Sequence, residues 1–71
     1  MSLDEAVAYA LEGVPEEAVR HGRSAADIAR ATGSSRITGE LRKLSIVLER
    51  WSSVAAVSEF RTDLARSFQG W

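Results

Sequence analysis

The chain of 71 residues contains no cysteine, one proline and one histidine. The absence of cysteine excludes disulfides and thiolate metal ligands, and a single histidine leaves few ways to build a zinc site. No run of about 18 apolar residues occurs, so no membrane-spanning helix is predicted. We therefore expect no metal, no cofactor and no membrane partner, and a fold held together by side-chain packing alone.

The first dozen residues also lack the uncharged apolar core of a secretory signal, because they contain Asp4, Glu5 and Glu12. We expect a cytoplasmic protein that forms a single small domain over residues 1–71. At this length, apolar burial worth about 25 cal/mol per Å² roughly offsets an ordering cost of about 1.5 kcal/mol per residue. The core is thus expected to be marginal, which favours a partner, a second copy or a larger parent chain.

The alternation of apolar and polar residues that is typical of β-strands is absent, and the sequence predicts helices throughout. Ser2 and Glu5 form a capping box that starts a first helix, and Gly13 ends it. Pro15 suits the first position of a second helix, with Glu16 and Glu17 near its positive end. The first helix is expected to bury an apolar stripe of Leu3, Val7, Ala10 and Leu11.

The segment HGRSAADIARATG raises the question of whether Ser24 caps a new helix or lies inside one that is already running. Small apolar residues continue through Gly22 at spacings of three and four, which favours one helix from about Pro15 to Ala31. Gly22 is then a point of close helix approach, and Gly33 ends the helix. The expected buried face is Ala18, Val19, Gly22, Ala25, Ala26, Ile28 and Ala29.

The clearest pattern is a heptad-like seam, which predicts that the third helix is the central helix of the core. Its members are Ile37, Leu41, Leu44, Leu48 and Trp51. Ser52 and Ser53 predict a break, and a fourth helix should bury Val54, Val57, Phe60, Leu64 and Phe68. The predicted fold class is all-α, with four helices in two stacked antiparallel hairpins over residues 2–32 and 34–68.

Charge is unevenly distributed along the chain. Residues 1–18 hold five acidic and no basic side chains, whereas residues 19–50 hold seven basic and three acidic ones. We expect the two parts to neutralise each other when the helices pack, and a nucleic-acid surface is the alternative.

A DNA-binding helix-turn-helix is the specific form of that alternative. Ala29 and Gly33 have the spacing of its turn, and the candidate nucleic-acid contacts are Arg36, Thr38, Arg42 and Lys43. However, the positions that normally anchor the second helix hold Ser34, Gly39 and Arg42, which are not apolar. Direct DNA recognition is therefore the less favoured reading.

The first two helices resemble a tetratricopeptide unit. Ala6 and Tyr9 match its first helix, and Ala18, Ala25 and Ile28 match its second. The remaining stretch, TGSSRITGELRKLSIVLERWSSVAAVSEF, looks like the closing segment of tetratricopeptide-containing transcriptional regulators of the actinobacterial type. The resemblance implies a role in protein contact and regulation.

No catalytic constellation is present, because His21 is the only histidine, and Ser34 and Ser35 fit a capping role. We expect a non-enzymatic module that binds a protein or peptide in a groove beside the small-residue face of the second helix. Candidate partner-binding residues are Arg20, Arg23, Arg30, Trp51 and Trp71, with the arginines steering acidic groups. Besides DNA binding, a homodimer formed through the leucine seam remains an open alternative.

Overall fold

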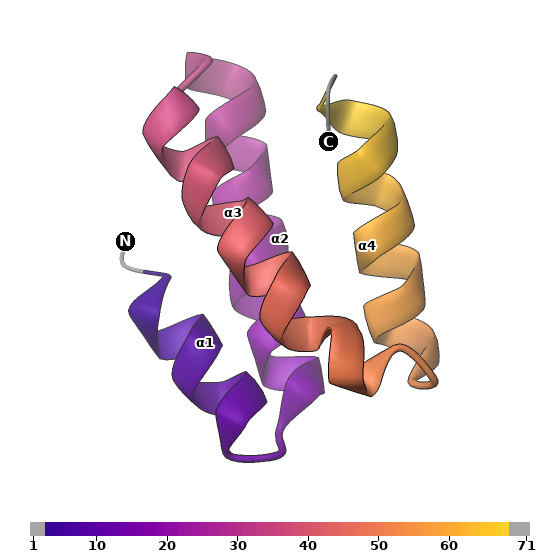
Figure 1. Cartoon of the computed structure of the whole chain (residues 1–71). Coiled ribbons are helices and arrows are strands. Elements are labelled where there is room, and N and C mark those ends of the chain that lie inside the picture. The colour runs from indigo at the N-terminus through magenta and orange to yellow at the C-terminus, as the bar shows by residue number, and fades with distance from the viewer. Residues whose placement is uncertain (1–2, 69–71) are drawn as a thin grey trace.

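The computed structural model describes residues 3–68, and all regular structure in that range is helical (Figure 1). The predicted all-α class with four helices is confirmed. In chain order the elements are α1 (Asp4–Leu11), α2 (Pro15–Thr32), α3 (Ser35–Leu48), the short 3₁₀ helix η1 (Glu49–Trp51) and α4 (Ala55–Ser67).

The boundaries predicted at Gly13, Pro15 and Gly33 hold because each has a local cause, whereas α3 ends at Leu48, before the predicted break, and Trp51 lies in η1. Gly13 and Gly33 adopt left-handed φ angles of 87° and 68°, and both follow the last turn of a helix. Pro15 opens α2, and the Ser34 hydroxyl caps α3 by accepting a hydrogen bond from the Ile37 amide at 3.3 Å. The capping box expected at the start of α1 depends on Ser2, which lies outside the described residues.

Helix α2 runs without a break from Pro15 to Thr32, so Ser24 lies inside a helix, as the sequence predicts. Gly22 is buried where α2, α3 and α4 meet. A Cβ atom added there would lie 2.5 Å from Phe60 Cζ and 3.0 Å from Leu44 Cδ2. The expected close approach at Gly22 is therefore confirmed.

The centre of the fold is α2, which packs against α1, α3 and α4. The prediction that the third helix would be central is wrong. The reason lies in side-chain size, since the buried positions of α2 are mostly alanine and glycine. Small side chains at Ala18, Ala25 and Ala29 let three neighbours approach one helix, whereas the leucines of α3 fill the space that remains.

Consecutive helices run in opposite directions, so α1 is parallel to α3, and α2 is parallel to α4 (Figure 1). The Cα atoms span 30 × 22 × 15 Å. The shortest extent matches two helix layers whose axes are about 8–10 Å apart. In addition to α2, α3 packs against α1, and this contact leaves the outer sides of both helices facing solvent.

The core contains the expected leucines of α3, since Leu41, Leu44 and Leu48 have no exposed surface. Val57, Phe60 and Leu64 of α4 join them, while Ile37, Val54, Trp51 and Phe68 pack around the core and remain partly exposed.

Two residues assigned to buried stripes point outward instead. Leu11 is 58% exposed and Ile28 is 40% exposed. Helix α1 buries Ala6 and Ala10, and the next residue along a helix is turned by about 100°, which carries Leu11 away from α2. Among the described residues, no helix combines the length and the apolar character needed to cross a bilayer.

Candidate partner-binding surface

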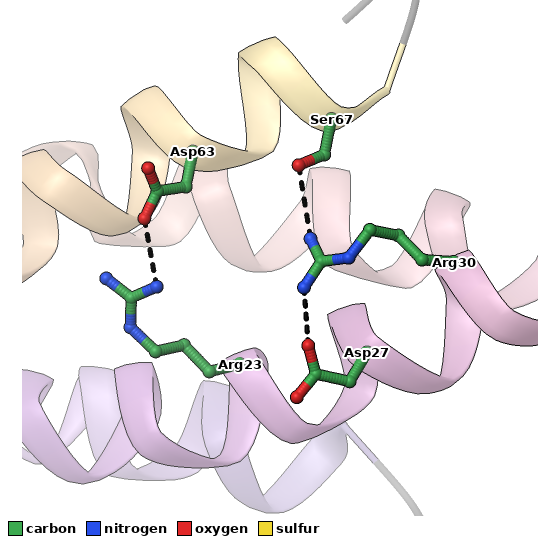
Figure 2. A network of polar contacts seen from close by, with 5 residues as sticks. All are labelled: Arg23, Asp27, Arg30, Asp63 and Ser67. Carbon is green, nitrogen blue, oxygen red and sulfur yellow. Dashed lines mark hydrogen bonds and ion pairs between the residues drawn. The ribbon is translucent and has the colours of Figure 1, made fainter.

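Two of the candidate partner-binding arginines connect α2 to α4 (Figure 2). Arg23 Nη1 donates to Asp63 Oδ2 at 3.0 Å, and its guanidinium carbon lies 5.6 Å from the centre of the Phe60 ring. Arg30 donates through Nη1 to the Ser67 hydroxyl at 3.1 Å and through Nη2 to Asp27. Both side chains therefore have partners within the chain.

These polar links are exposed and contribute little stability on their own. The Arg23 and Asp63 side chains are 45% and 50% exposed, and such pairs typically contribute about 0–1 kcal/mol. The attachment of α4 rests mainly on buried Val57, Phe60 and Leu64. The links orient the two guanidinium groups along the α2–α4 boundary.

Arg20 lies one turn from that boundary and pairs with Glu17 on the surface of α2. Its Nη2 atom is 2.8 Å from Glu17 Oε2. The hydrogen bond from Arg20 lowers the pKa of the Glu17 carboxyl below its ordinary value, and the pKa of Arg20 is raised in turn. The structure does not bring Arg20 together with Arg23 and Arg30 in one pocket.

A groove of about 540 Å³ opens where the end of α2, the start of α3 and the end of α4 meet. We call it the terminal groove. It brings together Arg30, predicted as a partner contact, with Thr38 and Arg42, predicted as nucleic-acid contacts. Its lining consists of Ala29, Arg30, Gly33, Ser35, Thr38, Gly39, Arg42, Ser67 and Phe68.

The lining of the terminal groove is basic and rich in hydroxyl groups. Among the residues that the structure describes, the lining contains two arginines, three hydroxyl side chains and no carboxylate. A Cβ atom added at Gly33 or Gly39 would meet nothing within 4 Å, so the two glycines leave open space there. Ala29 and Phe68 add apolar surface. Chemically, the groove suits a short segment that presents an acidic group beside an apolar one.

The predicted nucleic-acid contacts do not lie on one surface. The Thr38 hydroxyl is partly buried and donates to the Ser34 carbonyl oxygen at 2.9 Å. Arg36 and Lys43 are exposed and seven residues apart on α3, which places them on one row of the helix. Arg50, another seven residues along, is exposed in η1 and was missed as a candidate.

Trp51 holds the end of α1 rather than presenting its ring to solvent. Its indole Nε1 donates to the Ala10 carbonyl oxygen at 3.0 Å, and the ring is partly buried against the core. Trp71 lies outside the described residues.

Two of the residues considered as candidates for catalysis make structural contacts. His21 stacks on Tyr9, with ring centres 5.4 Å apart, and Ser34 is the cap of α3. Within residues 3–68, no group of three or more histidine, aspartate or glutamate side chains is arranged to hold a metal ion.

Sequence reasoning missed a second exposed surface, which lies along α1 and α3. Ile46 is 62% exposed, and with Leu11 it lines a groove of about 370 Å³ that also contains Val47, Glu49 and Arg50. The sequence does hold a signal for it. Ile46 is a large apolar residue on α3 that does not belong to the leucine seam.

Comparison with known proteins leaves the chain without a family assignment. No protein-family model matches the sequence, and neither a curated protein nor a solved structure matches it.

Proposed function

We propose that the chain is a non-enzymatic interaction module that binds an acidic segment of a partner protein in the terminal groove. The observation that carries the proposal is the composition of this groove, whose described lining combines Arg30 and Arg42 with three hydroxyls and no carboxylate. Its volume of about 540 Å³ falls within the range of about 300–1,000 Å³ that is usual for ligand sites.

The geometry of Arg30 supports this role. Asp27 of α2 and Ser67 of α4 accept from its guanidinium and orient it, although the Asp27 carboxylate also offsets part of the charge that a ligand carboxylate would meet (Figure 2). Less ordering on binding means less entropy lost, which raises affinity. Thr38 is likewise fixed by its bond to Ser34. A partner segment of a few residues then meets a largely preformed surface.

Selection of displayed random peptides tests the proposal. Peptides enriched on the wild-type protein are expected to carry Asp or Glu next to an apolar residue. Binding should fall at least about tenfold in Arg42→Glu, because the ligand carboxylate then faces a like charge. It should also be lost in Gly39→Leu, because position 39 lines the groove and a Cβ atom there meets nothing within 4 Å.

The matched control is Lys43→Glu, which makes the same change of charge one residue away, outside the groove lining. It should keep peptide binding. Enrichment of basic peptides, or equal loss of binding in Lys43→Glu and Arg42→Glu, would count against the terminal groove.

DNA binding is a second candidate, and the exposed row of Arg36 and Lys43, extended by Arg50, is the observation that favours it. Each phosphate contact adds about 0.9 to the slope of log affinity against log salt. A duplex mobility shift that weakens steeply with salt, and is lost when these three residues become glutamine, would support this candidate. Against it, α2 and α3 lie side by side in opposite directions, unlike the steep crossing of a helix-turn-helix (Figure 1).

The tetratricopeptide-like stacking of the two hairpins is part of the proposal as well. Its support is that α3 packs against both α1 and α2, whereas α4 packs against α2 rather than closely along α3.

A further inference from the structure

We propose that Ser67 is a phosphorylation site, and that its phosphate binds Arg30 and closes the terminal groove to acidic ligands. The closure rests on the function proposed above, whereas the binding of the phosphate by Arg30 does not. Ser67 is the last residue of α4, and its hydroxyl oxygen accepts a hydrogen bond from Arg30 Nη1 at 3.1 Å (Figure 2). The atom to be modified therefore already lies beside a guanidinium group.

Ser67 also has room for a phosphate, unlike another serine that accepts a hydrogen bond from an arginine. Ser45 accepts from Arg61 Nε at 3.3 Å, but only 5% of Ser45 is exposed. Ser67 is exposed and lines the open terminal groove. A phosphate on Ser67 thus meets solvent and the groove rather than the core.

The end of α4 is accessible to a protein kinase. Residues 65–67 are exposed, and the last buried residue of α4 is Leu64, so none of the residues in the final turn is buried. In the reaction, Ser67 Oγ forms a bond to the γ-phosphorus of a nucleoside triphosphate, and the bond from that phosphorus to its bridging oxygen breaks. The nucleoside diphosphate leaves, and the hydroxyl proton passes to the catalytic aspartate of the kinase.

The charges around Ser67 favour a phosphate. Phosphoserine carries a charge of about −1.5 to −2 at pH 7. Arg30 and Arg42 line the same groove, and Arg66 lies in the last turn of α4. These cations oppose the repulsion that the phosphate meets at the carbonyl end of a helix. The carboxylates of Asp27 and Asp63 are each paired with an arginine.

A phosphate on Ser67 competes with an acidic ligand for the same groove. It is attached to the chain next to Arg30, so its effective concentration at this guanidinium is high. It also adds negative charge to a lining in which the described residues include no carboxylate. The phosphorylated chain therefore binds an acidic segment more weakly, and removal of the phosphate opens the groove again.

A chain made with phosphoserine in place of Ser67 tests whether Arg30 binds the phosphate. A ³¹P NMR titration follows the second ionisation of the phosphate, whose pKa is ordinarily about 6. Because a guanidinium favours the dianion, this pKa should be at least about half a pH unit lower than in the same chain carrying Arg30→Gln. Equal pKa values in the two proteins would overturn the proposal.

Peptide binding tests the closure of the groove. Affinity for a selected acidic peptide should fall at least about tenfold when phosphoserine replaces Ser67. Phosphoserine in place of Ser58 is the matched control, since Ser58 is exposed on the same helix but does not line the groove, and it should leave the affinity unchanged. No loss at position 67, or an equal loss at both positions, would overturn the closure and leave the proposed function standing. An unmodified chain that selects no acidic peptide would instead overturn the proposed function together with the closure, whereas the phosphate pKa would still decide the role of Arg30.

The modification itself is tested with the folded full chain, a nucleoside triphosphate and an extract of the native host. Mass spectrometry should locate a phosphate on Ser67, and Ser67→Ala should lose it. A chain that gains phosphate only on other side chains, or none at all, would overturn the assignment of Ser67.

Discussion

At the scale of single residues, this fold depends on where side chains are small. Gly22 is buried against Phe60 and Leu44, and the neighbouring positions on the same face of α2 are alanines. Gly39 is the contrasting case, because it lies inside α3 with open space beside it. The same amino acid therefore serves close packing at one site, and at the other it leaves room in the terminal groove.

Replacing each of these glycines by alanine should change stability in opposite directions. Gly22→Ala should destabilise the protein by about 1–3 kcal/mol, because the new methyl group overlaps the buried Phe60 ring. Gly39→Ala should stabilise it by about 0.5–1 kcal/mol, because alanine is the better helix former and meets no neighbour. Urea denaturation measures both. Equal effects of the two substitutions would contradict the packing described for Gly22.

The sequence was informative about residues whose role follows from their own chain neighbourhood. The break at Gly33, the start at Pro15 and the close approach at Gly22 all rest on local spacing and were predicted correctly. The outward orientation of Leu11 was not, because it depends on α1 using only Ala6 and Ala10 against α2. The spacing of apolar residues along a sequence does not show how much of the helix surface will be buried.

At the scale of elements, α1 is the helix whose stability depends most on contacts with the rest of the fold. It has eight residues, and isolated helices of this length are not stable in water. Its end is tied to the chain 41 residues later by the hydrogen bond from Trp51 to the Ala10 carbonyl, and Trp51 also lies against Gly13. The 3₁₀ helix η1 that follows α3 thus has a structural role, because it places Trp51 against the end of α1.

Trp51→Phe tests this tie. Phenylalanine keeps most of the ring but removes the indole donor, and the loss of one hydrogen bond typically costs about 0.5–1.5 kcal/mol. Amide hydrogen exchange should accelerate in α1 more than in α2, because only α1 loses its connection to η1. An equal acceleration in both helices would show that Trp51 supports the whole core rather than the end of α1.

Packing between elements also explains which site residues could be predicted from the sequence and which could not. Arg30, Thr38 and Arg42 were each candidates, but for different functions, because the sequence does not show that the end of α2 and the start of α3 share one groove with the end of α4. Arg23 was a candidate too, and its pairing with Asp63, 40 residues away, depends on α4 lying parallel to α2. Such contacts follow from tertiary structure and have no local sequence signal.

At the scale of the whole molecule, the leucine seam is used inside the chain. Leu41, Leu44 and Leu48 are completely buried by the other helices, so Leu44→Asp would unfold a single copy whether or not it dimerises. That substitution therefore cannot distinguish loss of self-association from loss of the fold.

Mapping a bound peptide by NMR tests the central claim, that the terminal groove is the binding site, most directly. The ¹⁵N-labelled protein is titrated with an acidic peptide obtained by selection. Amide shifts should concentrate at the end of α2, over residues 35–42 and at Ser67, which surround the terminal groove. Shifts centred on Leu11 and Ile46, with the amides around Arg30, Thr38 and Gly39 unchanged, would contradict the account.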